Sequence, residues 1–232
     1  MRVLLIIGAP GSGKTWLAGV LAGRYRALVC GKDEIKEILF DTLGVSDPRD
    51  PPAPDLAWSR RLSDASFALL FAFAQRLLPV GRVLLLEGNF RPGEHERPLA
   101  ALLPAGGDTQ LVQILCHARP ASLAARLAAR AADPQRHPGH RDGLRAAGAP
   151  GALDAPGAAR AAEAVVADAA ATAAAAAEAR PEVSEPSGSD GFLALPGLRL
   201  RFDSDAPPER EFEGLFAALD ALDLAKTRDA SG

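Results

Sequence analysis

The sequence has few cysteines, few aromatic residues and only a small excess of charge. It contains two cysteines, one methionine and one tyrosine among 232 residues, and aromatic residues make up 5% of the chain. Cys30 and Cys116 lie far apart in the sequence, so they form neither a metal-binding spacing nor a disulfide framework. We expect both to be packing residues in a reduced compartment.

Long apolar runs are also missing. No stretch approaches the roughly 18 apolar residues that a membrane-spanning helix needs, and the chain opens on a short apolar segment that does not resemble a cleavable leader. The formal net charge of −3 gives no general attraction to nucleic acid or to anionic membranes. We therefore expect one cytoplasmic domain over residues 1–232, without a membrane partner and with nucleic acid disfavoured as a partner.

The most specific pattern lies at the beginning of the chain. The apolar run from Val3 to Ile7 is typical of a strand buried on both faces. A G-x-x-x-x-G-K-[ST] match follows: Gly8, Ala9, Pro10, Gly11, Ser12, Gly13, Lys14 and Thr15. In such a loop the backbone N–H groups surround phosphate, Lys14 reaches the β- and γ-phosphates, and the Thr15 hydroxyl binds Mg²⁺. The motif predicts a nucleoside triphosphate site with ATP and Mg²⁺ as cofactors.

A second group of candidates follows the next short apolar run, residues 27–30. Asp33 falls where this strand ends and a helix begins. It is interpreted either as an N-cap or as a general base aimed at a hydroxyl, because ligands of doubly wound sheets bind at the carboxyl ends of the strands. Lys36, one turn further on, either faces the same crevice and holds an acceptor or is a surface lysine.

The third apolar run, residues 83–87, ends in a carboxylate. Glu87 is expected to orient Mg²⁺ and its waters, with contact to the acceptor as the alternative. Arg91, in the loop that follows, is expected to hold the acceptor or the transferred phosphate. The next helical segment, residues 93–104, carries His95, which we expect to be exposed.

Basic residues gather after the fourth apolar run, residues 110–115. Arg126 and Arg130 lie one turn apart on a predicted helix over 121–132, and Arg136 and Arg141 follow in a loop. Arginines that converge in this way predict a phosphate clamp for the transition state, and the alternative is a solvated basic helix and turn. His137 and His140 lack a third metal ligand nearby. We assign residues 133–143 to a lid loop.

The remaining segments complete the predicted fold. Residues 144–190 form an alanine- and proline-rich insertion, in which residues 158–180 have high helix propensity. Residues 198–202 alternate like a strand with one exposed face, and 208–224 form a last amphipathic helix. An aromatic stripe over residues 56–78, which includes Phe67 and Phe73, is expected to face the core. The pattern indicates an α/β protein.

Taken in this order, the motifs resemble those of P-loop kinases related to adenylate kinase. Within that group the sequence is most similar to the AAA-type ATP-binding proteins grouped with zeta toxins, chloramphenicol phosphotransferase and polynucleotide kinases. The resemblance implies a three-layer fold, a five-stranded parallel sheet of order 2-3-1-4-5 and a lid after strand 4. It also implies that Asp33 accepts the proton of the acceptor hydroxyl, that Arg130 and Arg136 stabilise the transferred phosphoryl group, and that Arg126 lies near the adenine.

These observations predict an ATP- and Mg²⁺-dependent kinase that acts on a hydroxyl of a small molecule. Lys14, Asp33, Arg130 and Arg136 are its candidate catalytic residues. The alternative is a nucleotide-gated ATP-binding module or slow ATPase without such an acceptor. A GTPase switch is disfavoured because the sequence has no N-K-x-D motif for reading the base.

Overall fold

The computed structural model describes residues 2–44, 56–80, 83–103, 109–140, 190–222 and 224. The elements in chain order are β1 (Arg2–Gly8), α1 (Lys14–Tyr25), β2 (Leu28–Gly31), α2 (Lys32–Leu43), α3 (Leu56–Leu77), η1 (Leu78–Val80), β3 (Val83–Glu87), α4 (Glu96–Ala101), β4 (Gln110–His117), α5 (Pro120–Ala132), η2 (Pro138–His140), β5 (Leu198–Asp203) and α8 (Pro208–Asp220).

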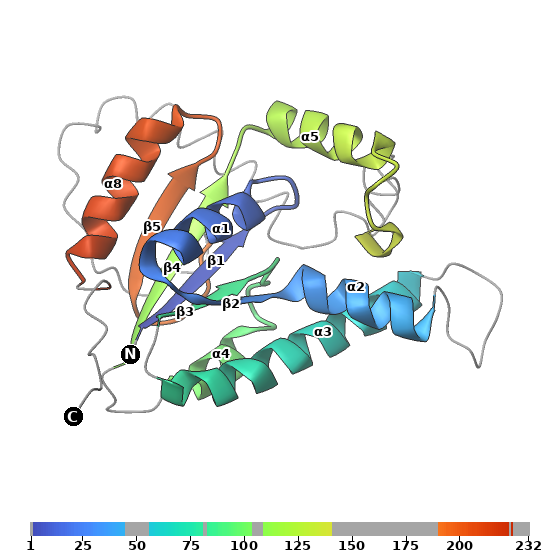
Figure 1. Cartoon of the computed structure of the whole chain (residues 1–232), viewed down its shortest axis with the longest axis horizontal. Coiled ribbons are helices and arrows are strands. Elements are labelled where there is room, and N and C mark those ends of the chain that lie inside the picture. Colours follow the sequence, from blue (N-terminus) through green and yellow to red (C-terminus); the bar gives the residue numbers. More distant parts are fainter. Residues whose placement is uncertain are drawn as a thin grey trace.

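The five strands form one sheet in the order β2-β3-β1-β4-β5, and every neighbouring pair is parallel. The central strand β1 pairs on both sides, with Leu4 opposite Leu85 of β3 and Val112 of β4. The predicted order 2-3-1-4-5 is therefore confirmed. The carboxyl ends of all five strands meet at one edge of the sheet, where α1, α2 and α5 approach each other (Figure 1).

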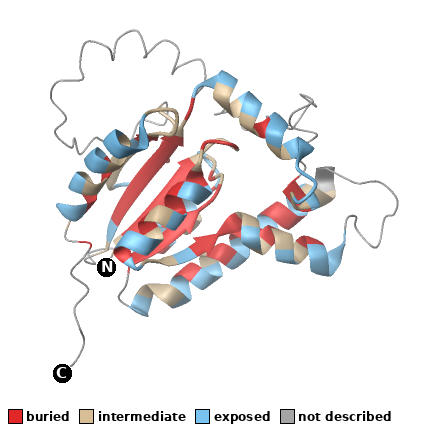
Figure 2. Cartoon of the chain, turned by 45° about the horizontal axis from the view of Figure 1, so that its top comes forward, coloured by how far each residue is buried: buried red, intermediate tan, exposed pale blue. Residues whose placement is uncertain are grey.

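Helices cover the sheet on both faces and give the fold its three layers (Figures 1 and 2). Side chains of β1 alternate between two apolar cores, as a strand buried on both faces requires. Leu4 and Ile6 pack against α1 and α8, whereas Leu5 and Ile7 pack against α3 and α4. The apolar runs in the sequence correspond to these buried strands.

The segment from 190 to 197 covers part of the apolar core that contains Leu5 and Ile7. Gln113 of β4 is fully buried, and its amide pairs with the backbone of Leu193 in both directions: the Leu193 N–H donates to Oε1 over 3.0 Å, and Nε2 donates to the Leu193 carbonyl over 3.3 Å. A buried polar side chain is tolerated when its hydrogen bonds are made in this way. The side chain thereby fixes the chain just before β5.

Two expectations about burial are wrong. His95 is 7% exposed, because Phe67, Phe71 and Phe90 surround its ring. In the stripe on α3, Phe67 is buried as expected but Phe73 is 46% exposed.

Parts of two predicted segments lie outside the described residues. These are positions 141–143 of the lid loop and positions 144–189 of the insertion, which include the helix predicted over 158–180. Of the helices that the structure describes, none is both long and apolar enough to cross a membrane.

Candidate functional site

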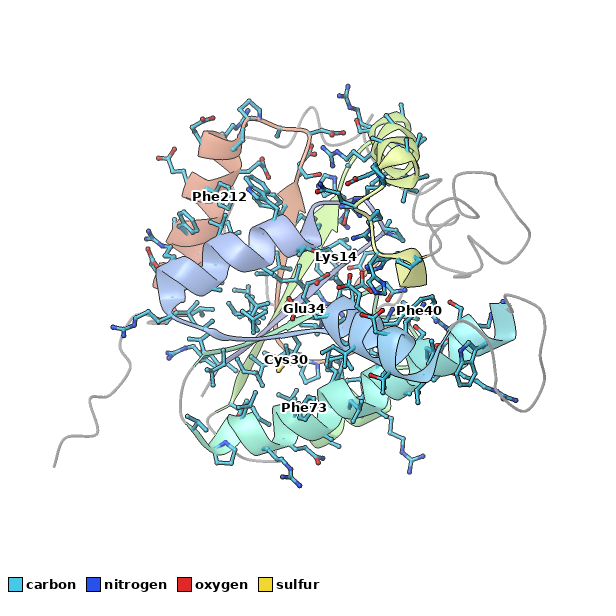
Figure 3. All side chains as sticks on the ribbon, turned by 45° about the vertical axis from the view of Figure 1, so that its right-hand side comes forward. Lys14, Cys30, Glu34, Phe40, Phe73 and Phe212 are labelled. Atoms are coloured by element: carbon cyan, nitrogen blue, oxygen red, sulfur yellow. The ribbon has the colours of Figure 1, made fainter. Side chains whose placement is uncertain are left out.

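A polar pocket lies at the carboxyl edge of the sheet. In Figure 3, Lys14 at the start of α1 and Glu34 at the start of α2 lie near each other, with α5 above them. Both line the pocket, which lies where doubly wound sheets bind their ligands. The lining residues are Pro10, Gly11, Gly13, Lys14, Thr15, Lys32, Asp33, Glu34, Glu37, Glu87, Asn89, Arg130, Arg136 and His140.

The loop between β1 and α1 has the geometry of a phosphate cradle. Gly11 and Gly13 have φ angles of 86° and 90°, a region that side chains with a Cβ rarely adopt. The loop curls tightly, with the Ser12 N–H donating to the Ala9 carbonyl over 3.2 Å. It delivers the chain directly into the N-terminus of α1, where backbone N–H groups and the helix dipole favour an anion. The residues present therefore fit a nucleotide phosphate.

Lys14 is buried at the base of this loop. It is 9% exposed, and its Nζ donates to the Ala9 carbonyl over 2.9 Å. Burial lowers the pKa of Lys14, and the nearby carboxylates of Glu87 and Asp33 oppose that shift. Glu87, at the end of β3, shows the reverse: burial raises its pKa, and the charge of Lys14 opposes the rise. A buried cation and a buried carboxylate thus stabilise each other's charge across the pocket.

Asp33 accepts a hydrogen bond from a buried lysine that the sequence analysis did not single out. Lys32 is 2% exposed, and its Nζ donates to Oδ1 of Asp33 over 3.1 Å. Burial by itself raises the pKa of Asp33, but the charges of Lys32 and His140 outweigh it and hold the pKa at about 2. Asp33 is the second residue of α2, and Gly31 occupies the N-cap position. The N-cap interpretation of Asp33 is therefore wrong.

The loop after α5 brings basic side chains over the pocket. Arg130, in the last turn of α5, and Arg136 both line it. Two histidines fasten this loop to α2: Nε2 of His137 lies 2.9 Å from Oδ1 of Asp41, and Nε2 of His140 is hydrogen-bonded to Glu37. The described part of the predicted lid therefore lies against the helix that carries Asp33.

Arg126 joins the phosphate loop to the turn after β5. Its guanidinium donates to the Gly11 carbonyl over 3.2 Å, to the hydroxyl of Ser204 over 2.7 Å and to Oδ1 of Asp205 over 2.9 Å. Burial by itself raises the pKa of Asp205, but hydrogen bonds from Arg119 and Ser122 and the charge of Arg126 hold it below its usual value. The phosphate loop and the turn after β5 are thus tied together by one side chain.

Two other predicted acceptor ligands are not among the residues that line the pocket. Lys36 is 4% exposed, and its Nζ donates to the hydroxyl of Ser59 on α3 over 2.9 Å. Arg91 forms an ion pair with Glu94 at 2.7 Å. The structure thus brings Asp33 and Glu87 together with Lys14, but places Lys36 and Arg91 elsewhere.

Several lining residues were missed by sequence reasoning. Lys32, Glu34 and Glu37 flank Asp33 on α2, and only their position beside that residue could have suggested them. Asn89 follows the carboxylate of β3 in the sequence, and its Oδ1 is buried without a hydrogen-bond partner in the part of the chain that the structure describes. An unsatisfied buried acceptor in a pocket wall indicates a place for a ligand's hydrogen-bond donor.

The donors fit a magnesium ion bound together with phosphate. Thr15 supplies a hydroxyl and Glu87 a carboxylate, and both line the pocket beside Lys14. Mg²⁺ in phosphoryl-transfer sites is held by one or two protein oxygens, with phosphates and waters completing its shell. The described residues contain no group of three or more histidine, cysteine, aspartate or glutamate side chains suited to hold a metal alone.

Residues 3–145 match the family model of the AAA domain, which covers more than half of the chain. The chain belongs to the AAA domain family. The matched residues span the phosphate loop, Asp33, Glu87 and the arginines of α5 and its following loop. The predicted kinship with AAA-type P-loop proteins is thereby confirmed. Among curated proteins no match was found.

Solved structures share the fold. A candidate kinase from Chloroflexus aurantiacus is 26% identical with a TM-score of 0.65, covering 95% of this chain and 97% of that one. A sugar kinase from Janibacter (14% identical, TM-score 0.48, covering 95% of each chain) and the APS kinase of Mycobacterium tuberculosis with AMPPNP and APS (16% identical, TM-score 0.48, covering 94% and 97%) are more distant. TM-scores below 0.5 are too low to bear on function. The fold is that of P-loop kinases.

Proposed function

We propose that this protein is an ATP- and Mg²⁺-dependent phosphotransferase that moves the γ-phosphoryl group to a hydroxyl of a small molecule. One observation carries the proposal. Lys14, Arg130 and Arg136 line the same pocket as the carboxylate of Asp33. That is the division of charge that in-line transfer to a hydroxyl requires.

The cationic groups suit the charge of the transferred phosphoryl group. Lys14 lines the pocket from the start of α1, Arg130 from the last turn of α5, and Arg136 from the loop that follows. Charge spread over the equatorial oxygens of a loose transition state is stabilised by cations fixed in place beforehand. Bound through Thr15 and Glu87, Mg²⁺ would neutralise further phosphate charge.

Asp33 is suited to orient the acceptor. A carboxylate with a pKa of about 2 stays ionised at every physiological pH, so it always accepts a hydrogen bond from a hydroxyl. Its side chain is 46% exposed although Lys32 beneath it is buried, so it opens toward the pocket. Oδ1 of Asn89 offers a second acceptor in the same wall, which favours a substrate with more than one hydroxyl.

The likeness to the Chloroflexus protein, which is described as a candidate kinase, supports the same activity. A second function remains as the competitor: an ATP-binding module or slow ATPase whose ligand state gates a partner. The two functions differ in what they require of Asp33. A kinase needs this carboxylate for transfer, whereas a binding module needs only the phosphate loop.

The test is transfer of label from γ-³²P-labelled ATP into separate pools of sugars and sugar alcohols, nucleosides, hydroxyl-bearing antibiotics and 5′-hydroxyl oligonucleotides. We expect wild type to label a small-molecule pool, Lys14→Ala to label none, and Asp33→Asn to label none while retaining ATP affinity. Tight ATP binding without product in any pool would exclude the kinase and favour the binding module. Product formation that survives Asp33→Asn would exclude the role given to that carboxylate.

A further inference from the structure

His140 lies between two carboxylates of α2 in the pocket wall. Its Nε2 is hydrogen-bonded to Oε1 of Glu37, and its Nδ1 lies 3.7 Å from Oδ2 of Asp33. The side chain is 4% exposed, so protein contacts and not solvent fix the ring. Arg136 and the ring of His137, 6.0 Å away between centroids, face it from its own loop.

The bond to Glu37 decides which nitrogen of the neutral ring carries the hydrogen. A carboxylate only accepts, so Nε2 donates and Nδ1 keeps its lone pair. Nδ1 then faces Oδ2 of Asp33, which is also an acceptor, at a distance too long for a direct hydrogen bond. Nδ1 of His140 and Oδ2 of Asp33 are therefore two hydrogen-bond acceptors in one pocket wall. A substrate hydroxyl that lies between them could donate its hydrogen to either.

The two acceptors differ in how well they hold a proton. Lys32 stays charged beside Asp33 when His140 is neutral, and this charge keeps the pKa of the Asp33 carboxyl low, which makes it a good hydrogen-bond acceptor but a poor base. Burial lowers the pKa of His140 below its usual 6.5, although Glu37 and Asp33 oppose that shift. The ring is therefore neutral near pH 7, where a general base of this kind works best.

Building on the proposed function, we propose that Nδ1 of His140 receives the proton of the acceptor hydroxyl, while Asp33 orients that hydroxyl and Glu37 orients the ring. As the acceptor oxygen bonds to the γ-phosphorus, the bond from that phosphorus to the β,γ-bridging oxygen breaks and ADP leaves with the bridging oxygen. The acceptor O–H bond breaks and its proton passes to Nδ1. The imidazolium later returns this proton to water.

His137 provides a matched control. It lies in the same loop and makes the same kind of bond, from Nε2 to Oδ1 of Asp41 on the same helix, over 2.9 Å. It is not among the residues that line the pocket. If the histidines only fasten the loop to α2, then His137→Gln and His140→Gln should impair the enzyme alike.

The experiment measures kcat and the KM for ATP of the full chain with Mg²⁺, ATP and the pool that wild type phosphorylates. We expect His140→Gln to lower kcat by about 100-fold, within the range of general-base catalysis, without changing the KM for ATP, and His137→Gln to keep kcat near wild type. The wild-type kcat should decline in acid with a midpoint below pH 6.5, and His140→Gln should lose that decline. Glu37→Gln should move the midpoint lower, because the imidazolium loses its neighbouring charge.

Equal losses in the two glutamine variants, or wild-type kcat in His140→Gln, would overturn this inference and leave the proposed function standing. A wild type that labels no pool would overturn both. A second readout does not depend on turnover: the chain has four histidines, so ¹⁵N spectra of the full chain with Mg²⁺ and AMPPNP can be assigned by substitution. We expect His140 to be neutral at pH 7.5 with its hydrogen on Nε2, and a hydrogen on Nδ1 would contradict the proposal.

Discussion

The ammonium group of Lys32 lies 3.1 Å from Oδ1 of Asp33, although the lysine side chain is 2% exposed and the aspartate 46% exposed. One oxygen of the carboxylate is thereby fixed from the interior. The other, Oδ2, is the one that lies nearest Nδ1 of His140. A buried charge without a partner is costly, so the pair holds Lys32 in place as much as it holds Asp33.

Replacing Lys32 with methionine should therefore lower kcat of the folded enzyme as well as its stability. We expect Lys32→Met to raise the pKa of Asp33 and to lower kcat about 10-fold, the equivalent of one charged hydrogen bond. Lys36→Met is the control, because Lys36 is equally buried but bonds Ser59 outside the pocket lining. It should lower the urea midpoint of unfolding and leave kcat of the folded enzyme near wild type. The same loss of kcat in both variants would argue against a role for Lys32 in positioning Asp33.

The phosphate loop makes a second prediction, about glycine. A Cβ added at Gly8 would lie 2.2 Å from the carbonyl oxygen of Cys116, so Gly8→Ala must displace backbone on β1 or β4. We expect a loss of at least about 2 kcal/mol of folding free energy and loss of ATP binding.

The control is a glycine in the middle of α1. A Cβ added at Gly19 would meet no neighbouring side chain or strand within 4 Å. Gly19→Ala should raise stability by about 0.5–1 kcal/mol. Denaturant titration and nucleotide binding measured on both variants check the pair, and normal ATP affinity in Gly8→Ala would refute the cradle geometry.

The strands could be predicted because their signals are local, and the order of the sheet followed from the resemblance to P-loop kinases. The apolar run Val3–Ile7 is visible in the sequence, and in the structure it lies within the buried strand β1. The glycine–lysine motif that follows requires a strand before it and a helix after it. The same reasoning placed Asp33 and Glu87 at strand ends, and the pocket contains both. Contacts within one short segment carried these predictions.

The missed features depend on contacts between distant segments. His140 meets Glu37 across 103 positions, and Arg126 meets Ser204 across 78. The residues next to His95 in the sequence suggest an exposed side chain. It is buried only because aromatic rings of α3 and of the loop after β3 pack against it. Lysine is almost never buried without a partner, so nothing local to Lys32 indicated that it would be.

The two arginines of α5 should separate binding from chemistry. Arg126 ties Gly11 to Ser204 and Asp205, whereas Arg130 lines the pocket itself. We expect Arg126→Met to raise the KM for ATP about 10-fold with a small change in kcat, because it loosens the phosphate loop. Arg130→Met should lower kcat about 100-fold, as removal of a fixed charge at the transition state does. Steady-state kinetics at saturating acceptor distinguish the two, and a change confined to KM in Arg130→Met would contradict its catalytic role.

Tyr25, at the end of α1 and outside the pocket lining, should make the free energy of unfolding decrease at alkaline pH. Burial, and then the hydrogen bond from its hydroxyl to Oδ1 of Asp220 at 2.8 Å, raise the pKa of Tyr25 to about 12. The unfolded chain loses this proton near pH 10, while the folded chain keeps it to about pH 12. Stability from this group is therefore constant below pH 10 and declines from there to pH 12.

Tyr25→Phe should cost about 1 kcal/mol at pH 8 through the lost hydrogen bond, and the difference from wild type should shrink steadily above pH 10. Subtracting the variant's free energy of unfolding from that of wild type cancels the lysines, which titrate in both proteins over the same interval. Urea titrations at pH 8, 10, 11 and 11.5 provide the measurement. A difference that stays constant over this range would show that neither burial nor Asp220 raises the pKa of Tyr25 in the folded state.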